Sequence, residues 1–284
     1  MARSWRPSRR SVLSPLHRVP NQGLPSPAHP PSERRPWTMN WNEFLPIPLI
    51  DSAQKYVVFQ PHSDDAVWFA GGLLLKLAKA GKDVTLVTMT DGCLGSMDVS
   101  MTRDRLVAVR RDEDQRAGEA IGVAKHLYLS FHDGELPHCG ETTTAMVRII
   151  RQEQPDAVLA PDPWLTYEAH QDHLNCGWSA AESMIYCNLP LYLPELPPHD
   201  VRFIAFYLTG RPNQFVDISA ENEVRLAALS LYRSQFTPET LEMATQYTTL
   251  KASDLGSTHG MQLAEAFKVL TPLHLHTSVD SETI

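Results

Sequence analysis

The chain of 284 residues is long enough to bury a hydrophobic core, as one large domain or two small ones. Its hydrophobic content of 43% and charged content of 20% are ordinary for a globular protein, and no apolar run is long enough to span a bilayer. The net charge is −8 for the whole chain and −14 for residues 39–284 (18 basic and 32 acidic), and a body this acidic argues against nucleic acid as the main partner.

Residues 1–38 differ in composition from the rest of the chain. They contain seven arginines, eight prolines and a single acid, Glu33, without hydrophobic periodicity. This pattern predicts a disordered, basic, Pro/Ser-rich leader followed by a single domain over residues 39–284. A twin-arginine export signal would need an apolar stretch that is missing, and the prolines oppose the amphipathic helix of a mitochondrial transit peptide. We therefore favour Met39 as the true start.

Strand and helix patterns alternate from residue 55 onward. Short apolar, β-branched runs predict strands at residues 56–60, 83–90, 126–130, 156–160 and 201–208. Helical patterns lie between them, at residues 65–81, 102–123, 142–154 and 172–186. This alternation predicts an α/β domain, a Rossmann-like three-layer fold with a largely parallel sheet. Each strand-to-helix turn then lies at the carboxyl edge of the sheet, where open α/β sheets bind ligands.

Two of these turns carry imidazoles and carboxylates. "QPHSDD" follows the first strand and contains His62, Asp64 and Asp65, and "HQDH" follows the fourth strand and contains His170, Asp172 and His173. A catalytic zinc site uses three N or O ligands from the protein and one open position. His62, Asp65 and His173 would supply two imidazoles and a carboxylate. Asp64 and His170 then remain for proton transfer and charge stabilisation.

A structural interpretation exists for each motif alone. Asp64 or Asp65 could cap the helix that follows, and Asp172 could favour the dipole of the next helix. Because both motifs follow predicted strands at one sheet edge, a shared site is the better interpretation.

The two motifs together resemble the PIG-L/LmbE-like deacetylases, which carry "H-P-D-D" and "H-x-D-H" in this order. Ser63 replaces the usual proline. "TDGCLG" at 90–95 is similar to the family's "T-x-G-E-x-G", with Cys93 where Glu is usual. Arg110, Glu113 and Ala117 with "IGV" fit its "R-x-x-E-x-x-x-A…LGV" helix, and "FHDGEL" and "NQFVDIS…SQF" fit later segments. The resemblance covers about residues 55–270.

The resemblance implies zinc-dependent removal of an N-acetyl group from an N-acetylglucosamine-type conjugate, a small-molecule substrate. By position, His62, Asp65 and His173 would bind Zn²⁺, Asp64 would be the general base, and a protonated His170 would stabilise the oxyanion. Arg110 and Asp133 are candidates for sugar contacts. The remaining alternatives are a catalytically degenerate sugar-binding module of the same fold and a metal-dependent phosphoesterase.

Two further expectations concern the cysteines and one apolar loop. Cys93, Cys139, Cys176 and Cys187 form no C-x-x-C pair, which favours a reducing compartment and a cytoplasmic location. Histidines outside the two motifs, such as His132, are interpreted as surface or core residues. The proline-rich segment 186–200 is either packed on the domain's own surface or forms an apolar rim at the mouth of the crevice.

Overall fold

The computed structural model describes residues 41–284. It divides into two compact units, of which the larger spans Leu45–Ile284, and the short helix α1 (Trp41–Phe44) belongs to the other. The domain boundary that the sequence predicts after residue 38 lies outside the described residues.

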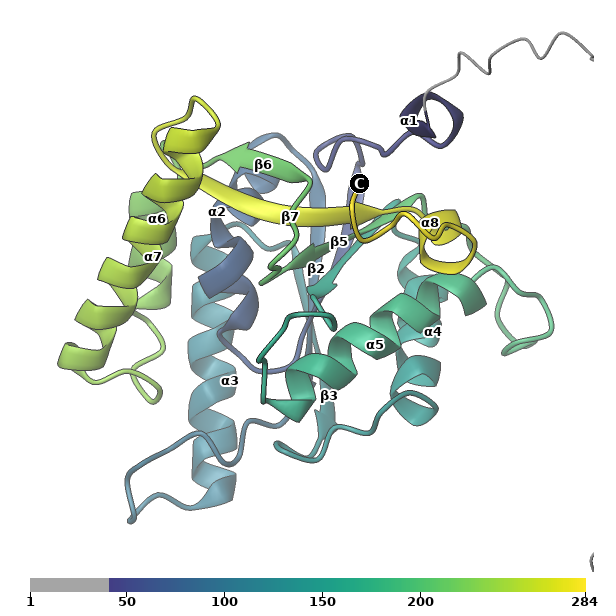
Figure 1. Cartoon of the computed structure of the whole chain (residues 1–284). Coiled ribbons are helices and arrows are strands. Elements are labelled where there is room, and N and C mark those ends of the chain that lie inside the picture. The colour runs from purple at the N-terminus through teal and green to yellow at the C-terminus, as the bar shows by residue number, and fades with distance from the viewer. Residues whose placement is uncertain (1–40) are drawn as a thin grey trace, which may run out of the picture. The chain divides into compact units, whose positions relative to one another are not determined.

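One seven-stranded sheet runs through the larger unit (Figure 1). Its strands are β1 (Lys55–Gln60), β2 (Asp83–Thr90), β3 (Lys125–Phe131), β4 (Ala157–Pro161), β5 (Phe203–Tyr207), β6 (Gln214–Asp217) and β7 (Ala264–Leu270). Their spatial order is β3-β2-β1-β4-β5-β7-β6. The first five pair in parallel, and β7 runs antiparallel to both of its neighbours.

The helices pack in two layers against this sheet. They are α2 (Asp65–Lys79), α3 (Arg103–Ala120), α4 (Glu141–Glu153), α5 (Gln171–Tyr186), α6 (Asn222–Leu229), α7 (Pro238–Thr258) and α8 (Pro272–His276). Helices α2, α3, α6 and α7 contribute to one hydrophobic cluster, and α4, α5 and α8 to the other, on the opposite face. This arrangement confirms the predicted three-layer α/β fold.

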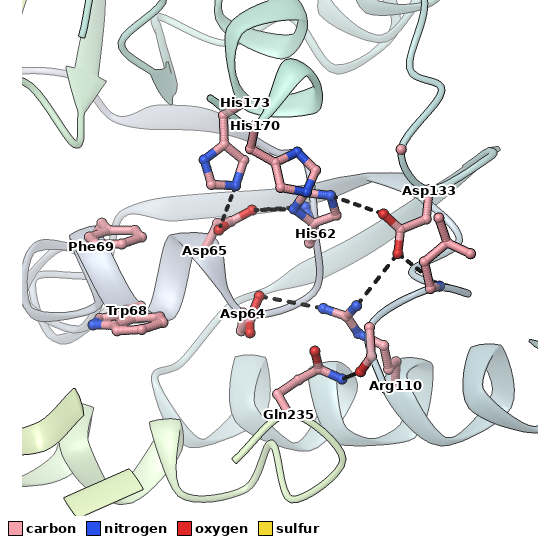
Figure 2. A pocket seen from close by; sticks show the side chains of 13 residues that line it. His62, Asp64, Asp65, Trp68, Phe69, Arg110, Asp133, His170, His173 and Gln235 are labelled. Atoms are coloured by element: carbon pink, nitrogen blue, oxygen red, sulfur yellow. Dashed lines mark hydrogen bonds and ion pairs between the residues drawn. The ribbon is translucent and has the colours of Figure 1, made fainter. Parts of the chain in front are cut away.

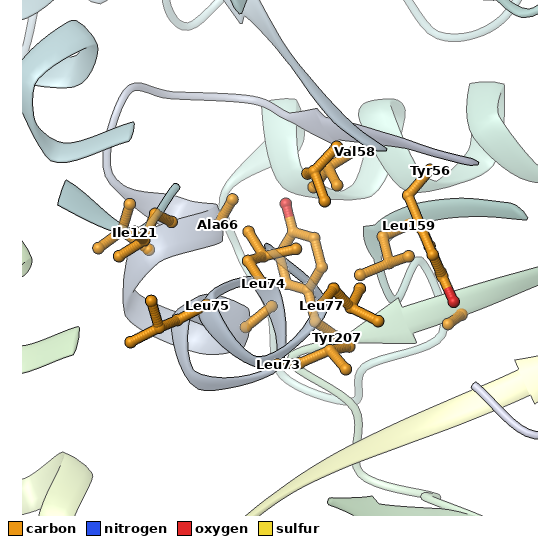
Figure 3. Close-up of a cluster of buried hydrophobic side chains, with 14 of the residues drawn as sticks. Tyr56, Val58, Ala66, Leu73, Leu74, Leu75, Leu77, Ile121, Leu159 and Tyr207 are labelled. Atoms are coloured by element: carbon orange, nitrogen blue, oxygen red, sulfur yellow. The ribbon is translucent and has the colours of Figure 1, made fainter. Parts of the chain in front are cut away.

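Local sequence explains where the elements begin and end. Helix α2 ends before Gly81, which adopts φ +72°, and Thr102 caps α3 by accepting a hydrogen bond from the Arg105 amide. Leucines of α2, such as Leu73 and Leu77, lie in a fully or almost fully buried cluster with strand residues (Figure 3). Burial of these apolar side chains is the main force that holds the helix on the sheet.

The crevice that holds the site follows from the strand order. Strands β1 and β4 are neighbours, but the connections after them cross in opposite directions, β1 toward β2 and β4 toward β5. The helix after β1 therefore covers one face and the helix after β4 covers the other. A parallel sheet opens a ligand crevice at such a switch point, outside the carboxyl ends of its strands.

All of the predicted strands and helices are present, with boundaries that differ by up to three residues. The strands β6 and β7 and the helices α6 to α8 were not among the predicted elements. None of the described helices combines the length and the apolar character needed to cross a membrane.

Candidate functional site

The turn after β1 is fixed by side chains of its own segment. The carboxylate of Asp65 accepts a hydrogen bond from the His62 amide at 2.9 Å, and the side chain of Gln60 accepts one from the Ala66 amide at 3.0 Å. Asp64 occupies the N-cap position of α2, but its side chain makes no capping hydrogen bond. Helix capping therefore does not account for Asp64, and its carboxylate faces the cavity (Figure 2).

The turn after β4 brings two histidines to the same place. His170 precedes the first turn of α5 and makes no side-chain cap, and His173 lies within that turn. Their rings stack with centroids 4.9 Å apart, and the His62 ring lies 4.5 Å from His170 and 5.3 Å from His173. The two motifs, far apart in sequence, thus meet in the crevice at the switch point.

Three of these side chains have the spacing of metal ligands. His62 Nδ1 lies 3.3 Å from Asp65 Oδ2, and His173 Nε2 lies 3.3 Å from Asp65 Oδ1 (Figure 2). One ligand atom from each of the three residues lies within 4.8 Å of the others. Tetrahedral zinc with N and O ligands at about 2.0–2.1 Å separates adjacent ligand atoms by about 3.3 Å. Two imidazoles and a carboxylate at this spacing fit a zinc ion.

Asp172 is a site residue that the sequence analysis placed in the crevice without a role of its own. Its fully buried carboxylate lies 3.2 Å from His62 Nε2 and accepts hydrogen bonds from the Gly134 amide at 2.7 Å and the Leu136 amide at 3.0 Å. A carboxylate on the far nitrogen of a ligating histidine fixes the tautomer and the ring orientation. The available signal was its position between His170 and His173, and the one specific role considered for it was to favour a helix dipole.

Arg110 and Asp133 connect the catalytic candidates. Arg110, from α3, places Nη2 3.5 Å from Asp64 Oδ1 and Nη1 3.9 Å from Asp133 Oδ2. Asp133, after β3, lies 3.3 Å from His62 Nε2. The Arg110 side chain is only 4% exposed, and its Nε has no hydrogen-bond partner in the described structure. Arg110 thus lines the cavity and also holds two carboxylates of the site in place.

The electrostatics of the site favour a bound cation. Burial alone would lower the pKa of His62, but the carboxylates of Asp133, Asp172 and Asp65 raise this pKa well above its usual value. Three carboxylates around one imidazole thus give the site a negative potential that favours a bound cation.

Burial moves the pKa values of the two remaining catalytic candidates in opposite directions. It raises the pKa of Asp64, which the Arg110 guanidinium only partly offsets. Burial and the nearby His62 and His173 lower the pKa of His170. This direction does not favour the protonated His170 that the resemblance implied, although a neutral imidazole can still donate one hydrogen bond.

The side chains surround a cavity of about 360 Å³ that all seven predicted site residues line. Trp68 and Phe69 form part of its wall, with rings stacked at 5.1 Å, and Leu94, Gly95 and Gln235 lie on another part. An aromatic wall with a few convergent polar groups is typical of small-molecule sites.

Comparison with known proteins agrees with this geometry. A family model described as PIG-L, GlcNAc-PI de-N-acetylase, matches residues 57–184. A diacetylchitobiose deacetylase from Thermococcus kodakarensis is 36% identical over 231 residues, 80% of this chain and 86% of that protein. The chain belongs to the PIG-L family.

A solved structure and a second deacetylase are also similar to this chain. The solved N,N'-diacetylchitobiose deacetylase from Pyrococcus horikoshii, complexed with its inhibitor MPG, has a TM-score of 0.82 and 36% identity, covering 86% of this chain and 94% of that chain. A 1D-myo-inositol 2-acetamido-2-deoxy-alpha-D-glucopyranoside deacetylase 2 from Saccharopolyspora erythraea is 30% identical over 224 residues, 61% of this chain and 81% of that protein.

The departure from the PIG-L pattern at Cys93 lies outside the three candidate metal ligands. Cys93 is 5% exposed and is not among the residues that line the cavity. Its Sγ lies 3.4 Å from Nδ1 of His132, on the adjacent strand connection.

The apolar segment 186–200 lies away from the cavity, so the rim hypothesis is wrong. Helix α5 starts at the carboxyl edge of the sheet and runs toward the amino edge, so the segment after it lies at the amino edge (Figure 1). There His199 Nε2 lies 2.7 Å from the carbonyl oxygen of Pro155, just before β4. Buried Arg151 of α4 fixes the segment by donating hydrogen bonds to five of its backbone carbonyls, those of Tyr186, Cys187, Leu189, Leu193 and Leu196. The alternative, a connection packed on the domain's own surface, is confirmed.

Proposed function

We propose that this protein is a zinc-dependent hydrolase that removes the N-acetyl group from an N-acetylglucosamine unit of a small conjugate. The observation that carries the proposal is that one cavity contains both a set of metal ligands and a candidate base. His62, Asp65 and His173 offer the two nitrogens and one oxygen that a catalytic metal needs. The carboxylate of Asp64, next to them, makes no helix-capping hydrogen bond.

The metal would be held by His62, Asp65 and His173, with Asp172 orienting the His62 ring. Zinc in such a site lowers the pKa of water to ~7 and polarises a carbonyl group. These are the requirements of amide hydrolysis at neutral pH, which needs a strong nucleophile and a place for negative charge on the carbonyl oxygen.

The protein's own residues would move the protons. Asp64 accepts a proton from the attacking water and delivers it to the leaving nitrogen as the C–N bond breaks, so that acetate and a free amine result. The raised pKa of Asp64 suits both steps. His170, on the opposite side of the cavity, donates a hydrogen bond to the carbonyl oxygen as charge develops. Arg110 and Asp133 contact sugar hydroxyl groups.

The substrate class rests on the relatives and on the shape of the cavity. The Thermococcus and Saccharopolyspora proteins are named for diacetylchitobiose and for an acetamido-glucopyranoside of inositol. Trp68 and Phe69 offer apolar faces of the kind that pack against a sugar ring, next to the polar groups that bind its hydroxyls.

The two alternatives fit the site less well. A degenerate sugar-binding module would not need Asp64 and the complete donor set side by side. A two-metal phosphoesterase needs carboxylates that are available to bridge two ions. The two further carboxylates beside His62 are already engaged: Asp172 uses both oxygens for backbone amides and shares one of them with His62, and Asp133 contacts His62 and Arg110.

Release of free amine from a panel of N-acetylglucosamine conjugates tests the proposal. The panel contains diacetylchitobiose and N-acetylglucosaminyl inositol, each with the zinc-loaded enzyme, after chelation, and after zinc is restored. We expect amine release that chelation abolishes and zinc restores. Turnover that survives complete chelation would overturn the zinc requirement. If the zinc-loaded enzyme releases no amine from any conjugate, the deacetylase assignment is overturned.

Location in the cytoplasm is also part of the proposal. The four cysteines are free thiols, the state that a reducing compartment maintains.

A further inference from the structure

A second cluster of metal-ligating side chains lies at the carboxyl edge of the sheet, outside the catalytic set. Asp91 and Cys93 follow β2, and His132 follows the adjacent strand β3. One ligand atom from each lies within 4.8 Å of the other two. We propose that Asp91, Cys93 and His132 form a second metal site, which binds zinc or a similar thiolate-tolerant divalent cation.

The distances within the cluster match one tetrahedral ion. Cys93 Sγ lies 3.4 Å from His132 Nδ1, and that nitrogen lies 3.4 Å from Asp91 Oδ2. Zinc bonds of about 2.3 Å to sulfur and about 2.0–2.1 Å to nitrogen and oxygen separate the ligand atoms by about 3.5 Å for S and N and about 3.3 Å for N and O. Little movement is needed to place an ion among the three atoms.

The geometry does not fit a nucleophilic Cys–His–Asp relay. In such a relay the thiol and the carboxylate contact opposite nitrogens of the imidazole, because one nitrogen takes the proton while the other is held by the acid. Here Cys93 and Asp91 both face Nδ1 of His132. Cys93 Sγ lies farther from Nε2, at 3.9 Å, so two donors beside one ring nitrogen, with the three ligand atoms within 4.8 Å of one another, fit a shared cation better.

The surroundings leave the converging atoms available. Asp91 uses its other oxygen, Oδ1, to accept hydrogen bonds from the amides of Cys93 and Asp133, both at 3.1 Å, which turns Oδ2 toward His132. The side chains of His132 and Asp91 are 35% and 23% exposed, so water can occupy a fourth position.

One neighbour has to move when the metal binds. Arg103 Nη1 lies 3.4 Å from His132 Nε2, which can accept a hydrogen bond from it. When a metal binds Nδ1, the ring proton is on Nε2, and Nε2 can no longer accept this hydrogen bond. Arg103 is exposed in the first turn of α3 and is free to turn into solvent.

The donor set decides the chemical class of the ion. A thiolate with an imidazole and a carboxylate selects zinc, cobalt or cadmium over magnesium and calcium, which prefer oxygen ligands alone. The catalytic set His62, Asp65 and His173 contains no sulfur, so the two sites have different optical signatures when they bind cobalt.

Cobalt titration of the metal-free full chain separates the two sites. We expect a near-ultraviolet thiolate-to-cobalt charge-transfer band that saturates at one equivalent per chain, within a total of two bound ions. Cys93→Ser should remove the band and one bound ion. His132→Ala should raise the Kd of the cobalt ion that gives the band by about tenfold or more. His173→Ala should lose the other ion and keep the band, whatever reaction the protein catalyses.

Cys139→Ser is the matched control. Cys139 also lies beside a histidine, with Sγ 3.8 Å from His138 Nε2, but belongs to no three-ligand group among the described residues. It should keep the band and both ions. The proposal is overturned if the wild type shows no band at saturating cobalt, or if the band survives Cys93→Ser. Unchanged circular dichroism of each variant shows that its loss of metal is not unfolding.

Discussion

Asp64 and Asp65 are adjacent in the chain, yet their environments drive their pKa values apart. Burial raises the pKa of Asp64. Burial acts in the same sense on Asp65, but the nearby His173 and His62 outweigh it and lower the pKa below its usual value. Carboxyl groups whose pKa values are driven apart are suited to different tasks, here proton transfer and charge-paired ligation.

Substitution of each aspartate should therefore produce a different defect. We expect Asp64→Asn to retain the metal and to lose turnover by about 10²–10⁴-fold, because a positioned base is removed. Asp65→Ala should lose most of the metal. Elemental analysis together with amine release distinguishes the two, and a metal-free Asp64→Asn beside a metal-replete Asp65→Ala would show that the two roles are reversed.

The pH profile should report the Arg110–Asp64 pair. A base acts when ionised, so kcat/KM should fall as pH drops through the pKa of Asp64, which is raised above its usual value. Arg110 favours the ionised carboxylate, so Arg110→Gln should raise that pKa further and move the acid limb to higher pH.

Arg111→Gln provides the matched control for this profile. Arg111 neighbours Arg110 in α3, but its guanidinium lies over the Tyr128 ring, 4.5 Å from the centroid. The acid limb of the kcat/KM profile of Arg111→Gln should coincide with that of the wild type. An unchanged limb in Arg110→Gln would show that Asp64 does not set it.

Asp172 should act on metal affinity through His62. Asp172→Asn keeps the shape of the side chain but weakens the orientation of the His62 ring, and we expect metal affinity to fall by about 10–100-fold. Competition with a chromophoric chelator measures this change. Full activity at saturating zinc would fit a positioning residue, whereas inactivity at full metal occupancy would assign Asp172 a direct part in the reaction.

Among the elements, α4 and the segment after α5 depend on one buried cation. Arg151 is 2% exposed, and its guanidinium donates to five carbonyls of residues 186–196. Without Arg151 these carbonyls lose their partners, and that of Cys187 is buried while the others are part-buried.

Arg151→Met should therefore destabilise the fold without a comparable effect on catalysis. We expect the free energy of unfolding to fall by roughly 2–5 kcal/mol, with kcat/KM at permissive temperature close to that of the wild type. Arg148→Met on the same helix removes only an exposed ion pair with Glu195 and should have a much smaller effect. A large loss of kcat/KM in folded Arg151→Met would show that the amino edge communicates with the cavity.

For the whole molecule, the basic segment 1–38 is expected to be dispensable. Its composition, rich in proline and arginine, offers little apolar surface for a core. A chain that begins at Met39 should match the full chain in melting temperature and in turnover. A fall of several degrees, or a loss of turnover, would show that the segment packs against the domain.

The sequence by itself determined the order of elements from Lys55 to Tyr207 and predicted the candidate metal ligands. Hydrophobic periodicity is a local property, so the strands from Lys55 to Tyr207 and the helices between them could be predicted before any contact was known. Because parallel strands expose their carboxyl ends at one edge, two histidine motifs after strands were enough to predict a shared site. The later antiparallel edge of β7 and β6 was missed, because β6 has only four residues and β7 carries Glu265 and Lys268 among its apolar residues, so neither forms a continuous apolar run.

Only the tertiary structure decided which neighbours each side chain meets. Asp172 became a partner of His62 because α5 and the turn after β1 converge, and Cys93 met His132 because β2 and β3 are adjacent in the sheet. The apolar segment 186–200 was placed by the direction of α5, which carries it to the edge opposite the cavity. Contacts between residues distant in the chain depend on how the elements pack, and single-segment patterns do not encode that packing.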